Sequence, residues 1–288
     1  MLSRFFKAKP DPVPAGEFAT VFPALPAKAA QAWAEEQLFR TSARPEDLAD
    51  QITRFRLIAA RDDLSLGVQV NARVAMTHKL MERGDLAGLA ALMPELAATR
   101  ARIPTASKTA PMRENLWHLT CSAQFVSLNA ALMLGDFDAA RALAADVPLT
   151  LPDRPDSLPA FFYRTCANYA RCCGLAAAAA VREDDVERLT VLTLACRKAL
   201  HHGLTLRPSE CKPAKREDAQ AIPLADREFF RAAALSELLD LLREAPAEAR
   251  LPLVAQIGRL CLAQRTPEQL ERLLAAFTRF ATGDAAVR

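Results

Sequence analysis

Apolar residues recur every three or four positions along almost the whole chain, and short runs of turn residues separate the segments that show this pattern. A repeat near 3.6 residues is typical of amphipathic helices that pack against one another. The pattern predicts helices over residues 27–40, 45–60, 66–83, 86–100, 113–134, 137–145, 159–182, 186–200, 224–244 and 251–264. A last helix is predicted from Pro267 onward, with Thr266 as its N-cap residue.

The longer helices carry the clearest apolar stripes. In residues 113–134 the stripe consists of Trp117, Cys121, Phe125, Leu128 and Leu132. In residues 224–244 it consists of Phe230, Ala234, Leu238 and Leu241. Because such stripes are the faces that helices bury against each other, they predict the core.

Composition supports an all-α fold without a sheet. Alanine and leucine, both strong helix formers, are the most frequent residues, whereas the 288-residue chain has only 9 Gly, 2 Tyr and 2 Trp. Strands favour β-branched and aromatic residues. Dinucleotide-binding folds and P-loops need glycines at fixed turn positions, so the scarcity of glycine counts against both.

Three tight turns, Gly84-Asp85, Gly135-Asp136 and Asp184-Asp185, follow long helices at intervals of about 50 residues. This spacing favours antiparallel αα-hairpins stacked as an α-solenoid, with an irregular helical bundle as the alternative. We expect residues 1–25 to form a disordered or extended tail and residues 26–205 to form the hairpin array. Residues 222–282 are expected to form a helical cap continuous with that array.

The second of these turns resembles a tetratricopeptide repeat. Over residues 132–143, Gly135-Asp136-Phe137 precedes a helix with the small residue Ala140, and Pro152 stands where a proline would close the repeat. The resemblance covers about 25 residues. It implies a scaffold that binds peptides or proteins and not an enzyme.

The net charge of +3 is too small for the whole chain to act as a polyanion binder. No apolar run reaches the length of a membrane span. Residues 1–10 are basic and apolar, which suits a disordered tail, a membrane anchor or a presequence. The 7 cysteines have no regular spacing, which is typical of reduced thiols and predicts a cytoplasmic protein.

No motif predicts a catalytic residue, a cofactor or a metal site. Asp184-Asp185 is the best candidate for Mg²⁺-diphosphate chemistry, but no two aspartates lie four residues apart anywhere in the chain, as such a site requires. Carboxylates at a helix N-terminus are also explained by capping. The favoured function is therefore a non-catalytic scaffold or adaptor, and the alternative is an all-α enzyme that acts on an anionic, diphosphate-like substrate.

The scaffold hypothesis places a protein or peptide partner along one side of the array, and acidic partners are among those considered. Basic side chains between hairpins would attract it, and polar side chains of the long helices would line its groove. The predicted residues are Arg100, Arg102, Lys212 and Lys215 at the rim and His78, His118 and Asn168 in the groove. DNA is not expected, and RNA is disfavoured because the sequence lacks a set of aromatics for base stacking. The alternative explanation is that these cations only complement helix C-termini.

Overall fold

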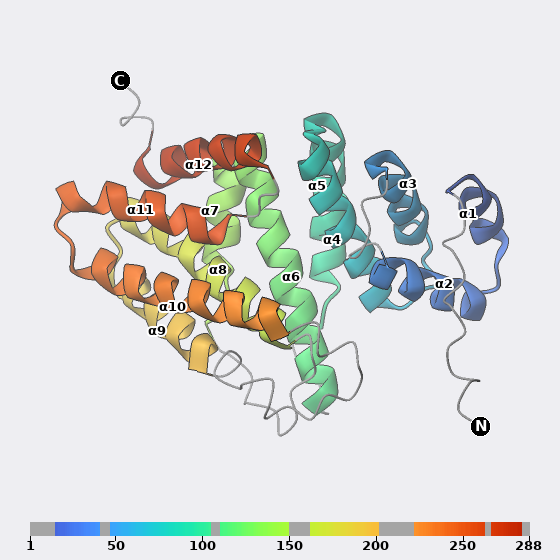
Figure 1. Ribbon diagram of the computed structural model, residues 1–288, viewed down its shortest axis with the longest axis horizontal. Coiled ribbons are helices and arrows are strands. Elements are labelled where there is room, and N and C mark those ends of the chain that lie inside the picture. The colour runs from blue at the N-terminus through green and yellow to red at the C-terminus, as the bar shows by residue number, and fades with distance from the viewer. Residues whose placement is uncertain are drawn as a thin grey trace. The chain divides into compact units, whose positions relative to one another are not determined.

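The computed structural model describes residues 15–40, 47–104, 110–149, 162–201, 222–262 and 266–283 (Figure 1). Within these ranges the chain forms helices and no strand, so the all-α prediction is confirmed. The helices in the same ranges include none that is long and apolar enough to span a membrane. The chain divides into two compact units between Lys79 and Leu80. The array expected over residues 26–205 is therefore divided at this point.

The first unit contains α1 (Ala15–Val21), η1 (Phe22–Ala24), α2 (Ala27–Arg40), α3 (Leu48–Ala59) and most of α4 (Leu66–Arg83). The rings of Phe18 and Phe22 stack at 4.6 Å between centroids, and both side chains are fully buried. Arg61 donates to the carbonyl oxygens of Phe22 and Leu25 at 3.0 and 2.8 Å. The expectation of a tail over residues 1–25 is thus wrong for residues 15–25, because two buried phenylalanines anchor them. Residues 1–14 lie outside the described ranges.

The second unit begins with the last turn of α4 and contains the remaining helices. These are α5 (Leu86–Ala101), α6 (Ala110–Leu134), α7 (Phe137–Ala145), α8 (Phe162–Arg182), α9 (Val186–Ala199), α10 (Ile222–Glu244), α11 (Ala247–Cys261) and α12 (Pro267–Thr282). The predicted helices are confirmed, and their bounds differ from the predicted ones by a few residues. The hydroxyl of Thr266 accepts a hydrogen bond from the backbone N–H of Gln269, so the predicted N-cap of α12 is confirmed as well.

The three predicted turns have one common construction. In each, the helix ends on a residue with positive φ, which is 73° at Gly84, 73° at Gly135 and 53° at Asp184. The next residue, an aspartate, bonds back to a carbonyl five residues earlier, as in a Schellman motif. The carboxylate of the same aspartate then caps the following helix by accepting from the N–H three residues ahead. One residue pair therefore ends one helix and begins the next.

Successive hairpins of the second unit pack onto each other. Helix α6 contacts α8, and α8 contacts α10. Each second helix lies against its own hairpin and the following one, since α7 contacts α6 and α8, and α9 contacts α8 and α10. Contacts between sequence neighbours of this kind are the ones expected for stacked αα-hairpins.

Helix α8 lies at the centre of this unit. It contacts α6, α7, α9, α10, α11 and α12 (Figure 1). Every residue from Cys172 to Ala180 is buried. Gly174 lies so close to α11 that an added methyl group would overlap the sulfur of Cys261. A helical segment that is apolar on all sides needs cover on all sides, and residues 172–180 of α8 receive it from these neighbours.

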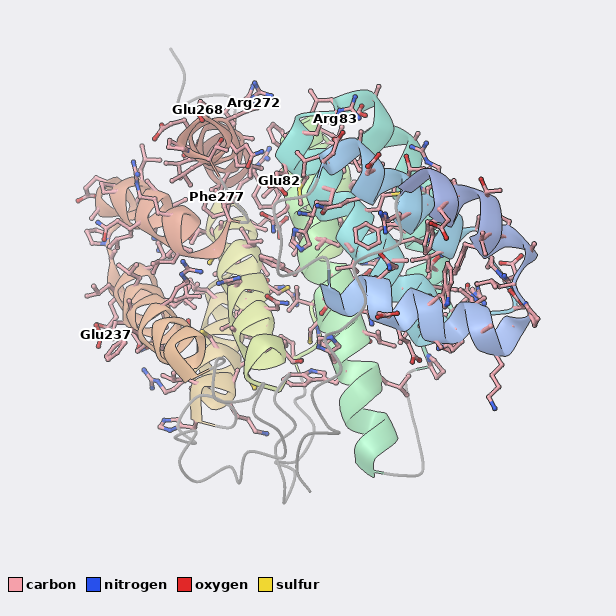
Figure 2. All side chains as sticks on the ribbon, turned by 45° about the vertical axis from the view of Figure 1, so that its right-hand side comes forward. Glu82, Arg83, Glu237, Glu268, Arg272 and Phe277 are labelled. Atoms are coloured by element: carbon pink, nitrogen blue, oxygen red, sulfur yellow. The ribbon has the colours of Figure 1, made fainter. Side chains whose placement is uncertain are left out.

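Helix α12 closes the stack by crossing the ends of earlier helices. At its start, the side-chain amide of Gln269 donates to the carbonyl oxygens of Met81 and Glu82 at 3.0 and 2.6 Å. Near its end, the ring of Phe280 lies 6.3 Å from that of Phe137 at the start of α7. Figure 2 shows Glu82 and the α12 residue Phe277 at the same end of this unit. The C-terminal segment is thus a closing helix that returns to the first turn of the unit.

The predicted apolar stripe of α10 is not the buried one. Phe230 and Leu241 are 69% and 54% exposed. The buried side chains are instead Ala232, Leu235, Leu239 and Leu242. Helix α10 has apolar residues on two overlapping stripes, and contact with α8 and α11 selects the second one.

We predict that Gly135→Ala lowers the free energy of unfolding by about 1 kcal/mol, because a Cβ disfavours positive φ. The space around Gly135 is open, with no atom within 4 Å of an added Cβ, so the loss is due to the backbone alone. Gly135→Asn should lose clearly less, since asparagine tolerates this conformation. Urea unfolding measures both, and equal losses for the two variants would contradict the assignment.

We also predict that Gln269→Ala lowers the free energy of unfolding by about 1–2 kcal/mol, because the carbonyl oxygens of Met81 and Glu82 at the end of α4 lose the side-chain donor that ties α12 to them. The matched control is Gln256→Ala on the exposed face of α11, which should change stability by less than about 0.5 kcal/mol. If both variants unfold at the wild-type urea concentration, Gln269 does not hold α12 in place.

Candidate protein-binding surface

Arg100, predicted at the rim of a groove, is used inside the fold. Its guanidinium donates to the side-chain oxygen of Gln124 on α6 and lies 3.5 Å from a carboxylate oxygen of Asp146, just after α7. Gln124 is 3% exposed, and its amide nitrogen donates to the carbonyl oxygen of Leu143. Arg100 and Gln124 therefore join α5, α6 and α7 through one polar network.

The predicted groove residues lie in two different units. His118 on α6 is half-buried, and its Nδ1 lies 2.7 Å from the hydroxyl of the fully buried Thr165 on α8. Asn168 is half-buried on α8, one turn beyond Thr165. The structure thus places His118 and Asn168 on the adjacent helices α6 and α8. His78 is half-buried on α4, in the first unit.

Of the remaining predicted rim residues, Arg102 is exposed and is the C-cap residue of α5. Lys212 and Lys215 lie outside the described residues, as does Pro152. A basic rim that includes all four predicted cations therefore stays a prediction.

The aspartates considered for Mg²⁺-diphosphate binding have structural partners. The Asp185 carboxylate caps α9 by accepting from the N–H of Arg188. Asp184 pairs with Arg250 of α11 at 3.1 Å. Among the described residues, no three His, Cys, Asp or Glu side chains are grouped so that they could hold a metal ion.

The six described cysteines are free thiols, and all are buried: Cys121, Cys166, Cys172, Cys173, Cys196 and Cys261. Burial raises the pKa of each thiol, because an apolar environment disfavours the thiolate. The pKa of Cys196 rises to about 12. Since the thiolate is the nucleophile, these six groups serve as core residues near neutral pH.

The outward side of α10 carries two large apolar side chains, Phe230 and Leu241, on a face that also holds an alanine and two glutamates. Phe230, Ala234, Glu237, Leu241 and Glu244 follow one another at intervals of four, three, four and three residues, which places them on one helix face. Glu237 is labelled in Figure 2 and points away from the bundle. We call these five residues the α10 stripe.

Helix α9 also exposes apolar side chains. Leu194 is 52% exposed and Val186 is 50% exposed. Leu189, Leu192 and Cys196, which face α8, are at most 2% exposed. The outward side of α9 therefore presents a leucine and a valine to solvent.

Two ion pairs show how α9 and α10 lie beside each other. Arg197, near the end of α9, pairs with Asp240 near the end of α10. Asp184, just before α9, pairs with Arg250 in the first turn of α11, the helix that follows α10. Moving back along α9 thus corresponds to moving forward along α10, so the two helices are antiparallel and Leu194 lies opposite the segment that begins at Leu241.

Exposed apolar residues are therefore more frequent on this pair of helices than on the others that the structure describes. Of the seven large hydrophobic residues that are exposed in the described ranges, four lie on α9 and α10: Val186, Leu194, Phe230 and Leu241. By the antiparallel register Leu194 and Leu241 lie near each other, and adjoining exposed apolar groups mark surfaces that bind other proteins.

Sequence reasoning assigned Phe230 and Leu241 to the core and did not select Leu194. A signal for them was present, because α10 has leucines at 238 and 239 and again at 241 and 242. A helix packed on one side cannot bury both members of each pair. The sequence pattern alone does not say which member faces the core.

No family model matches the sequence, and comparison with curated proteins and with solved structures gives no match either. The resemblance of residues 132–143 to a tetratricopeptide repeat accordingly stays a prediction.

We predict that Arg100→Ser lowers the free energy of unfolding by about 1–2 kcal/mol, because it leaves the buried side-chain oxygen of Gln124 without this donor. Arg102→Ser is the matched control two residues away, at the exposed end of the same helix, and should cost clearly less, because interactions of an exposed cation are screened by water. Thermal and urea unfolding compare the two variants. Equal stabilities would show that Arg100 is a surface cation, as first predicted.

Proposed function

We propose that the protein is a non-catalytic helical scaffold of the cytoplasm that binds another protein through the α10 stripe. The observation that carries this proposal is the exposure of Phe230 and Leu241, 69% and 54%, on a helix whose opposite side is well packed. Large apolar side chains on a protein surface lose contact with water when a partner covers them, which favours association.

The chemistry of the α10 stripe indicates the kind of partner. Its spacing of four and three residues is the spacing by which two amphipathic helices pack along their length. Two of its members, Glu237 and Glu244, are acidic and exposed. The matching partner is an amphipathic helix with apolar side chains at the centre of its binding side and Lys or Arg beside them.

A reducing compartment agrees with the buried thiols. The six described cysteines are unpaired, although several lie within one core. Compartments that form disulfides would be expected to make use of such thiols, so these support the cytoplasmic location. The tetratricopeptide-like turn at Gly135 supports a scaffold in the same way, as a resemblance.

We predict that Leu241→Asp abolishes capture of partner proteins from a lysate of the source cells, because it replaces one of the two large apolar side chains of the α10 stripe by a charge that cannot be buried against an apolar surface. The matched control is Leu86→Asp, which places the same charge at another exposed leucine, 40% exposed at the start of α5. Quantitative mass spectrometry of the bound proteins compares both variants with the wild type.

The supporting result is a set of proteins retained by wild type and Leu86→Asp and lost with Leu241→Asp. If the three baits retain the same proteins, the α10 stripe is not the binding surface. Circular dichroism of each bait confirms that the helices are intact before the comparison is made.

A further inference from the structure

The outermost side of α9 carries four residues at intervals of four, three and four: Glu187, Val191, Leu194 and Lys198. The other sides of this helix are occupied. Leu192 and Cys196 are buried, α9 contacts both α8 and α10, and Arg188 donates to the carbonyl oxygens of Ala144 and Ala145 at the end of α7 at 2.9 and 2.8 Å. Glu187, Leu194 and Lys198 are exposed, and Val191 is half-buried. We call these four residues the α9 stripe.

The α9 stripe has the same spacing in both directions along the helix. If two copies of α9 lie antiparallel about a point between Val191 and Leu194, each Leu194 meets the second copy's Val191. Each Glu187 then meets the second copy's Lys198. The order acid, apolar, apolar, base is therefore complementary to itself in the antiparallel orientation.

We propose that two copies of this chain associate through their α9 stripes, related by a two-fold axis that makes the two helices antiparallel. The occupant of this surface is thus a second copy, and the helix involved is α9 and not α10. The inference goes beyond the proposed function and does not depend on which protein binds the α10 stripe.

The charges favour a second copy over a foreign helix. Within one chain Glu187 and Lys198 are eleven residues apart, about 16 Å along the helix axis, so they do not neutralise each other. A uniformly basic or acidic partner would match only one end of the stripe. A second antiparallel copy matches both ends and opposes the two helix dipoles as well. Isologous contacts of this kind are the usual basis of two-fold dimers.

The contact is small, because one helix of each copy contributes to it. Interfaces at the low end of the size range support weak, reversible complexes. We therefore expect a monomer–dimer equilibrium that is visible between about 1 and 200 μM protein at low salt. Since charged pairs at the edge are screened by ions, the dimer should dissociate further in high salt.

Sedimentation velocity of the full chain over this concentration range tests the proposal. The wild type should shift from monomer to dimer, and Leu194→Asp should remain monomeric. Phe230→Asp, a change at the end of the α10 stripe that lies away from α9, should dimerise within about threefold of the wild-type dissociation constant, because Phe230 precedes Asp240, the partner of Arg197, by almost three helical turns. This last comparison separates the two proposals, since each variant disables only one surface.

Charge reversal tests the antiparallel register. Glu187→Lys and Lys198→Glu should each weaken the dimer about tenfold, because each replaces two attractive pairs by two repulsive ones. The double variant Glu187→Lys/Lys198→Glu restores opposite charges across the two-fold axis and should return to within about threefold of the wild type. Circular dichroism checks that both single variants are folded.

Three results would overturn the proposal. One is a wild type that stays monomeric over the whole concentration range at low salt. Another is a dimer that Leu194→Asp leaves unchanged, which would assign self-association to a different surface. The third is a double variant no tighter than the weaker single variant, because the antiparallel pairing requires mutual rescue.

Discussion

Burial of α8 on all sides is the constraint on which the second unit depends. From Gly174 to Ala180 the helix consists of glycine, leucine and alanine, with no polar face to leave in water. Helices that precede α8 in the sequence, α6 and α7, and helices that follow it, α9 and α10, must therefore cover it. Helices α11 and α12 cover the sides of α8 that these four leave exposed. The small side chains also allow close approach, as at the contact of Gly174 with Cys261. The last helix thus completes the core that the middle of the chain requires.

This construction decides where a partner can bind. Two of the polar side chains predicted to meet a partner, Arg100 at the rim and His118 in the groove, join neighbouring helices instead. Their hydrogen bonds are satisfied inside the fold, so a partner would have to compete with them. The exposed leucines of α9 and α10 have no such internal role. The surface available for association is therefore on the outward sides of these helices.

Helix bounds and turns were predictable because their signals are local. A Gly-Asp pair combines a residue that tolerates positive φ with one that caps the next helix, and both effects act within a few residues. The position of α12 was not predictable, since the bonds from Gln269 to Met81 and Glu82 join residues far apart in sequence. The buried stripe of α10 and the burial of Phe18 and Phe22 also depend on distant partners. The candidate surface was missed because it consists of residues left over after packing.

Native-state hydrogen exchange tests most directly whether α8 and α12 form one core. If they do, the amides of residues 172–180 exchange only through global unfolding, and the central amides of α12 open with nearly the same free energy. The opening free energies of both sets of amides should then decrease in parallel as urea is added. Exchange of α12 through a much smaller opening, while α8 stays protected, would contradict the claim that the closing helix is part of the core.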